Sequence, residues 1–142
     1  LKKLSREHHH GLLLAWKIKT GFSKKIPAER IKKYTDWFYS AHLKPHFQEE
    51  EKYVFPILGN DNILIQKAVQ EHQQLAQLFN ETDNLEMALK QIAIDLVNHI
   101  RFEERILFNQ IQAKATPEEI TMIEALQTSE SFIDNTTDPF WN

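Results

Sequence analysis

Two short stretches of the sequence repeat one pattern of residues that can bind a metal ion. Residues 46–55 (HFQEEEKYVF) and residues 99–108 (HIRFEERILF) both read His-x-x-x-Glu-Glu-x-x-x-Phe. Side chains four residues apart lie one above the other on an α-helix. His46 with Glu50, and His99 with Glu103, would each direct an imidazole and a carboxylate toward one point, which is the geometry of a metal-ligand pair.

The composition indicates what kind of fold positions these pairs. The chain has 142 residues, of which 42% are hydrophobic and 26% charged, as in an ordinary globular protein. Only three glycines and five prolines are present, which is few for a β-rich protein with many tight turns. We therefore expect one all-α domain over residues 1–142, built from long helices.

Hydrophobic periodicity predicts where the first two helices lie. The first is expected over residues 4–19, with Gly21 ending it. The second is expected to start at Pro27 and to end before Gly59. Pro45 lies inside the second helix and removes a backbone hydrogen bond, so we expect a bend there.

Three further helices complete the expected fold. Asp61 is expected to cap the third helix, and the fourth starts at Leu85. Thr-Pro-Glu-Glu at 116–119 is the signature of a capped short fifth helix that extends to about Gln127. Four helices with short connections pack most simply as an antiparallel up-down-up-down bundle, here over residues 4–113. Residues 116–142 then form a C-terminal helix and tail, whose Phe140-Trp141 end can fold back on the bundle.

Four histidines, one on each of the four bundle helices, take inward positions in this pattern: His8, His46, His72 and His99. Tyr53 and Ile106 are expected on the same inner face. A single histidine on an apolar face is more often a hydrogen-bonded core residue than a ligand. Glu50 and Glu103 change that interpretation, because burying an ionised carboxylate costs several kcal/mol unless it is paired or coordinated. We therefore expect a bound cation in the core.

The ligand types indicate which metal this is. The chain has no cysteine, so thiolate sites are excluded. Imidazoles with carboxylates suit iron, manganese or zinc, and two glutamates can bridge two ions. A dinuclear iron centre fits best. The ferritin-like alternative uses Glu-x-x-His twice, and here that spacing occurs only from Glu7 to His10.

The motifs occur in the order Arg6-Glu7-His8, His46-Phe47 with Glu49-Glu50 and Phe55-Pro56, Glu71-His72, and His99 with Glu103-Glu104. In this order they resemble a hemerythrin-like (HHE cation-binding) domain of the bacterial type, over residues from about Leu4 to Ala113. The resemblance implies an antiparallel four-helix bundle with a non-haem di-iron site, bridged by carboxylates and an oxo group. Carried over residue by residue, one iron would be held by His8 and His46 and the other by His72 and His99, with Glu50 and Glu103 bridging.

The sequence departs from the oxygen-carrying members of that family. Those members place a second histidine one turn from the third-helix ligand, where this chain has Ala76 after His72 and Ala68 before it. They also end with His-x-x-x-x-Asp, where this chain has His-x-x-x-Glu. The bacterial branch includes iron-sulfur cluster repair proteins, but these usually carry a cysteine-bearing N-terminal region, and this chain has no cysteine.

Three functions are compatible with these observations. The chain can be a di-iron module that binds O2 or NO as a sensor, a carrier or an iron-handling protein. It can be a di-iron oxidoreductase acting on O2, peroxide or NO, or an iron-sulfur repair-type protein. It can also be a structural bundle that a metal holds together. The first is favoured, because no second group of acids, bases or nucleophiles occurs outside the metal ligands, and no catalytic residue is assigned.

Two other histidines and the overall charge bear on the site and its partners. His42 lies one turn before His46 and is expected to be a hydrogen-bonding partner of a ligand, an alternative ligand or a rim residue. His9 is the alternative if His8 points away. The net charge of −3 disfavours nucleic acid as a partner. The longest apolar run, residues 12–16, is far shorter than the about 20 residues that span a bilayer, so a cytoplasmic protein is expected.

Overall fold

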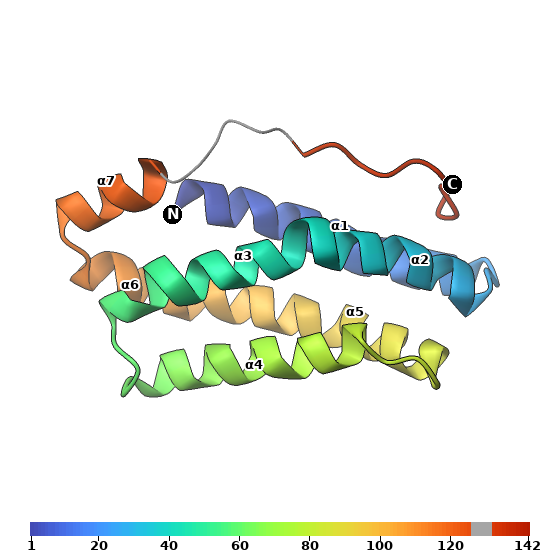
Figure 1. Ribbon diagram of the computed structural model, residues 1–142, viewed down its shortest axis with the longest axis horizontal. Coiled ribbons are helices and arrows are strands. Elements are labelled where there is room, and N and C mark those ends of the chain that lie inside the picture. The colour runs from blue at the N-terminus through green and yellow to red at the C-terminus, as the bar shows by residue number, and fades with distance from the viewer. Residues whose placement is uncertain (126–131) are drawn as a thin grey trace.

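The computed structural model describes residues 1–125 and 132–142 (Figure 1). All regular secondary structure in these residues is helical. Three of the segments, η1, η2 and η4, are π-helical turns, and η3 is a short 3₁₀ turn. The elements are α1 (Lys2–Ser23), α2 (Ala28–Phe38), η1 (Tyr39–Leu43), α3 (Lys44–Glu49), η2 (Glu50–Val54), η3 (Phe55–Ile57), α4 (Ile63–Phe79), α5 (Leu85–Phe102), η4 (Glu103–Leu107), α6 (Phe108–Lys114) and α7 (Pro117–Ala125).

These elements form four antiparallel rods, as the sequence predicts (Figure 1). The first rod is α1, and the third is α4. The second rod runs without a break from α2 to η3, and the fourth runs from α5 to α6. α5 packs along α1, α4 and α2. α7 turns back across the end of the bundle near the start of α1, and residues 132–142 run along the outside of the first two rods (Figure 1). The prediction of an all-α bundle is confirmed.

The starts of α4 and α7 follow local sequence signals, with a shift of one residue at α4. The cap of α4 is Asn62 instead of Asp61, because the Asn62 side chain accepts a hydrogen bond from the Leu64 backbone N–H at 2.8 Å. At α7, the Thr116 and Glu119 side chains each bond the other residue's backbone N–H, at 3.1 and 2.9 Å. The predicted capping box is therefore confirmed. The predicted helix end near Gln127 lies outside the described residues.

Gly21 does not end the first helix, which continues to Ser23. The glycine instead gives close approach to its neighbours. A Cβ atom at this position would lie 2.8 Å from the Ile31 Cδ1 atom and 2.9 Å from the Phe140 ring. Gly21 thus lets α2 and the C-terminal segment pack against α1, and Phe140 is buried there, as its predicted fold-back requires.

The turn η1 ends at Leu43, two residues before Pro45, whose missing N–H cannot support a regular α-helical turn. The structure shows this π-helical turn beside the proline, and the bend expected there stays a prediction.

The turns η2 and η4 begin at Glu50 and Glu103, the first glutamate of each repeated Glu-Glu pair. A π-helical turn holds one more residue than an α-helical turn, so it moves the inward face along by about one residue. Val54 and Leu107 are accordingly fully buried. The predicted inward position of Ile106 is wrong, since Ile106 is 48% exposed, whereas Tyr53 is half-buried and packs against the apolar cluster around Val54.

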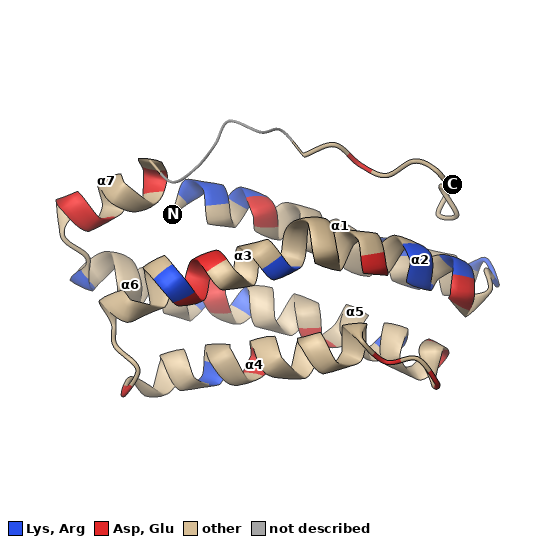
Figure 2. Cartoon of the chain, viewed as in Figure 1, with Lys and Arg blue, Asp and Glu red and all other residues tan. Residues whose placement is uncertain are grey.

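Two apolar clusters fill the bundle on either side of a polar layer. One cluster includes Leu14, Leu75 and Leu96, and the other includes Leu4 and Leu107. Along each rod the predicted ligands fall between residues of the two clusters. Lysine and arginine are concentrated on α1, α2 and their connection (Figure 2). Among the described residues, no helix is both long and apolar enough to cross a membrane.

Candidate metal centre

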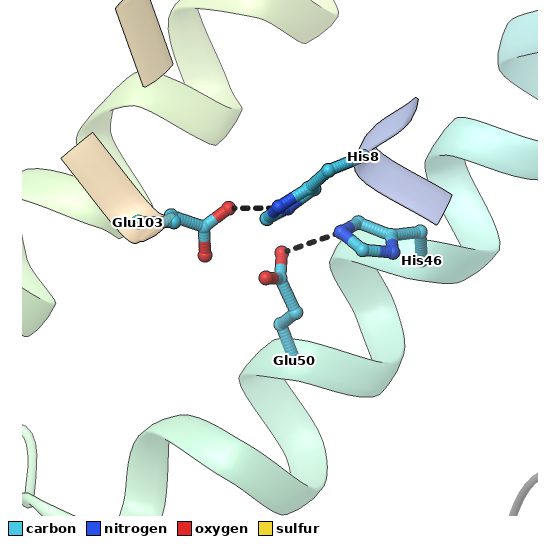
Figure 3. A group of neighbouring side chains, drawn as sticks. All are labelled: His8, His46, Glu50 and Glu103. Carbon is cyan, nitrogen blue, oxygen red and sulfur yellow. Dashed lines mark ion pairs between the residues drawn. The ribbon is translucent and has the colours of Figure 1, made fainter. Parts of the chain in front are cut away.

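Six buried polar side chains from the four rods meet between the apolar clusters. All are at most 5% exposed, and they are the six that the sequence predicts: His8, His46, Glu50, His72, His99 and Glu103. They form two groups that could each hold a metal ion, and within each group the donor atoms all lie within 4.8 Å of one another. One group adds His8 and His46 to the two glutamates (Figure 3). The other adds His72 and His99 to the same two glutamates.

The inward-facing atoms of this set form no hydrogen bond of good geometry among the described residues, and they meet only one another at ion-pair distances. They are the Nε2 atoms of all four histidines and both carboxylate oxygens of Glu50 and Glu103. The His99 Nε2 atom lies 2.8 Å from a Glu103 oxygen, and the His46 Nε2 atom lies 3.4 Å from a Glu50 oxygen. Burying so many unsatisfied polar atoms is unfavourable unless a cation lies between them. The donor set therefore fits iron, manganese or zinc.

Each of the four imidazoles is held at its other nitrogen by a separate carboxylate. The Nδ1–H groups of His8, His72 and His99 donate at 2.7 Å to Glu104, Glu51 and Glu71. His46 Nδ1 is 3.3 Å from Glu7. A carboxylate at Nδ1 fixes the tautomer in which Nε2 keeps its lone pair for a metal. Four outer glutamates thus orient four inner imidazoles.

The sequence interpretation missed the role of these outer glutamates, although a signal for them was present. Glu51 and Glu104 are the second residues of the repeated Glu-Glu pairs, and Glu7 and Glu71 each precede a predicted histidine ligand. Consecutive helix side chains point about 100° apart. Glu50 therefore points to the centre while Glu51 reaches sideways to α4.

The carboxylates also control the charge of the imidazoles. Burial opposes protonation of His99, but Glu103 and Glu71 outweigh it and raise the pKa of His99 to about 10. Burial likewise opposes protonation of His46, whose pKa Glu50 raises well above its ordinary value. Burial opposes ionisation of Glu103, and His99 nevertheless holds its pKa well below the ordinary range. Without a metal, the centre is therefore a set of ion pairs, and a binding metal must displace protons.

The two donor groups differ in their aromatic neighbours. The His72 ring stacks on Phe47, with ring centres 3.8 Å apart, and on Phe55 at 5.5 Å. The His8 ring stacks on Phe108 at 5.3 Å. Phe108 is the counterpart of Phe55 in the repeated motif, but the counterpart of Phe47 is Ile100.

A cavity of about 530 Å³ borders three of the four donor histidines, His8, His46 and His99, and both Ile100 and Phe47 lie in its wall. His42 also lines this cavity, where its ring contacts Trp37 and Phe38. It belongs to neither donor group among the described residues, so the structure places it at the rim. His9 is exposed, and His8 is the inward residue.

Ala76, one turn from His72, is half-buried and offers no ligand atom. Ala68, on the other side of His72, is fully buried. Each donor group therefore consists of two histidines and the two shared glutamates.

Comparison with known proteins agrees with this geometry. The family model described as the hemerythrin HHE cation binding domain matches residues 1–111. No curated protein and no solved structure matches the chain significantly. The matched residues include all six inner side chains and all four outer glutamates, while α7 and residues 132–142 lie beyond them. The chain therefore belongs to the hemerythrin HHE cation-binding domain family.

Proposed function

We propose that the six inner residues hold two iron ions, and that the centre binds O2 or NO as a sensor, a carrier or an iron-handling protein. The observation that carries this proposal is that two donor groups share Glu50 and Glu103. A carboxylate has two oxygens, so each shared glutamate can bridge two metals. When bound, iron would supply coordination positions for a diatomic ligand and a change of oxidation state.

The chain's own residues would then orient and protect the centre. The outer glutamates fix the direction of each imidazole. The apolar clusters above and below exclude water, which strengthens electrostatic interactions inside the bundle. Both effects are expected of a binding site that must hold metal tightly while a small ligand comes and goes.

Equal donor sets support a second candidate, a di-iron oxidoreductase acting on O2, peroxide or NO. Each group offers two imidazole nitrogens and the oxygens of the shared carboxylates, so neither metal would be saturated by protein ligands. Open positions on both metals suit reactive chemistry as well as ligand binding.

Metal analysis tests the site directly. We expect about two metal ions per chain, and we expect His99→Ala to lose one or both. His9→Ala is the matched control, because His9 is an exposed histidine on α1 outside both donor groups. Unchanged metal content in His99→Ala would refute the site.

Gas binding separates the two candidate functions. For the first, the reduced protein should form a spectroscopically defined adduct with O2 or NO and should return to its starting spectrum when the gas is removed. Sustained consumption of O2 or peroxide in the presence of an added reductant would instead support the oxidoreductase.

A further inference from the structure

The cavity beside His8, His46 and His99 is much larger than a diatomic ligand needs. Its volume is about 530 Å³, whereas one water molecule occupies about 30 Å³ in the liquid. This volume falls within the range of about 300–1,000 Å³ that is typical of small-molecule sites. Glu50 and Glu103 are absent from its walls, so the cavity lies beside the two donor groups and not between them.

One end of the cavity is apolar and aromatic. Its walls include Phe38, Leu43, Leu96, Ile100 and Phe132. The Phe132 ring stacks on the His10 ring at 4.0 Å and lies 4.6 Å from the His42 ring. Such an assembly of ring faces and edges favours a flat apolar body.

The C-terminal segment holds Phe132 in this position. The buried Lys17 ammonium donates hydrogen bonds to Asp134 and, at 2.8 Å, to the Tyr34 hydroxyl. It also lies 4.0 Å from the Trp141 ring centre. These contacts fix the path of residues 132–142, which lie beyond the family match. This wall of the cavity is therefore supplied by the chain outside its family domain.

The other end of the cavity is lined by charged side chains of both signs. Lys3, Arg6 and Glu7 line it. Lys3 pairs with Glu49 at 3.1 Å, and the Glu7 carboxylate lies beside the His46 ring. Arg6 forms no ion pair with a carboxylate in the described part of the chain. A guanidinium at the edge of an apolar cavity is suited to a carboxylate.

We infer that this cavity binds a second ligand beside the metal centre, a small organic molecule with an aromatic body and one carboxylate. The body lies against Phe38 and Phe132, and the carboxylate faces Arg6. This site goes beyond the proposed function and is independent of it, because its walls are formed whichever metal the centre holds.

Calorimetric titration of the zinc-loaded full chain with 2-naphthoate tests this inference. The neutral isostere 2-naphthamide serves as the matched ligand. We expect one 2-naphthoate per chain and about threefold to fivefold weaker binding of the amide, since an exposed ion pair contributes up to about 1 kcal/mol. Absence of binding would overturn the inference.

Variants locate the bound probe. Ala41 is an exposed residue in the cavity wall, so Ala41→Phe should fill the cavity and weaken 2-naphthoate binding more than tenfold. Ala113→Phe, at an exposed position on α6 outside the wall, should leave binding unchanged. If Ala41→Phe binds 2-naphthoate as tightly as the unchanged protein, the probe binds elsewhere and the inference is overturned.

Two further pairs test the walls separately and decide the matter if Ala41→Phe does not fold. Phe132→Ala should weaken binding about threefold to tenfold, as loss of one aromatic contact predicts, whereas Ile133→Ala, at a 79% exposed position, should not.

Arg6→Gln should abolish the preference for 2-naphthoate over the amide. Arg101 is exposed and lies outside the cavity wall, so the control variant Arg101→Gln should keep the preference for 2-naphthoate. Equal effects within either pair would contradict the inference.

Discussion

The two donor groups of the centre are built from the same parts but lie in different surroundings. Each has a Glu-His pair on one rod, Glu7-His8 or Glu71-His72, and one copy of the His-x-x-x-Glu-Glu-x-x-x-Phe motif on the next rod. In each donor group, the glutamate of the Glu-His pair contacts the Nδ1 atom of the histidine that begins the motif. The second glutamate of each motif holds the histidine of the opposite Glu-His pair. The bundle thus has an approximate twofold relation between its halves.

The difference between the halves lies at the residue after the motif histidine. Phe47 covers the His72 ring, and the cavity is lined by both histidines of the other half, His8 and His46, but in this half by His99 and not by His72. The repeated residues determine how a metal is held, and the unrepeated residues determine how it is reached. We therefore expect equal metal binding by the two halves and unequal access to them.

Removing a shared glutamate should have the largest effect, because it breaks both halves at once. Glu103→Ala is expected to lose most of both ions, while His46→Ala should mainly affect the ion of its own group. Metal content per chain measures the result, and Glu118→Ala, at an exposed position on α7, is the control. Loss of only one ion from Glu103→Ala would contradict the shared role.

Metal removal should make stability depend strongly on pH. In the metal-free protein the pKa of His99 is raised from 6.5 to about 10, so its stabilisation is complete below about pH 6.5 and is lost as the pH rises toward 10. The pKa of Glu103 is lowered from 4.5, so its stabilisation is present above that pH and is lost in acid. The metal-free protein should therefore be most stable between about pH 4.5 and 6.5.

Denaturant unfolding of both forms across this pH range measures the effect. The metal-loaded protein should not show the alkaline decline, because its imidazoles are neutral ligands. An equal alkaline decline in both forms would contradict the ion-pair description of the metal-free centre.

The outer glutamates offer a test of the twofold relation itself. Glu51→Ala should weaken the metal held by His72 and His99, and Glu104→Ala the metal held by His8 and His46. Loss of such a partner typically lowers metal affinity about 10-fold to 100-fold. Competition with a chelator measures both variants. Loss of affinity in only one of them would show that the halves are not equivalent as metal sites.

The sequence was sufficient to predict the inner residues, because helical spacing alone places His46 above Glu50 and His99 above Glu103. The apolar neighbours of His8 and His72 then indicated that they face inward. The bundle followed from the same periodicity and from the scarcity of glycine.

Features that depend on contacts between distant residues could not be predicted in the same way. The π-helical turns at Glu50 and Glu103 have no local propensity signal, so the inward residue is Leu107 and not Ile106 as expected. Gly21 looked like a helix end, because its role depends on Phe140, more than a hundred residues away. The cavity wall at Phe132 likewise depends on the pairing of Lys17 with Asp134.

The smallest expected effect concerns access to the metals. Phe47→Ile gives the His72 half the residue that the His8 half has at Ile100, and so removes the ring stacked on His72. We expect azide to bind a few times faster in stopped-flow experiments with the metal-loaded variant, because Phe47 lies in the cavity wall and a smaller side chain there opens the cavity toward His72. Stability should fall by about 1–3 kcal/mol, since a buried aromatic ring is replaced by a smaller side chain. Leu64→Ile, at a half-buried position on α4, is the control for a general loosening of the bundle. If Phe47→Ile binds azide at the original rate, both metals are already reached through the existing cavity, and the difference between the halves has no effect on access.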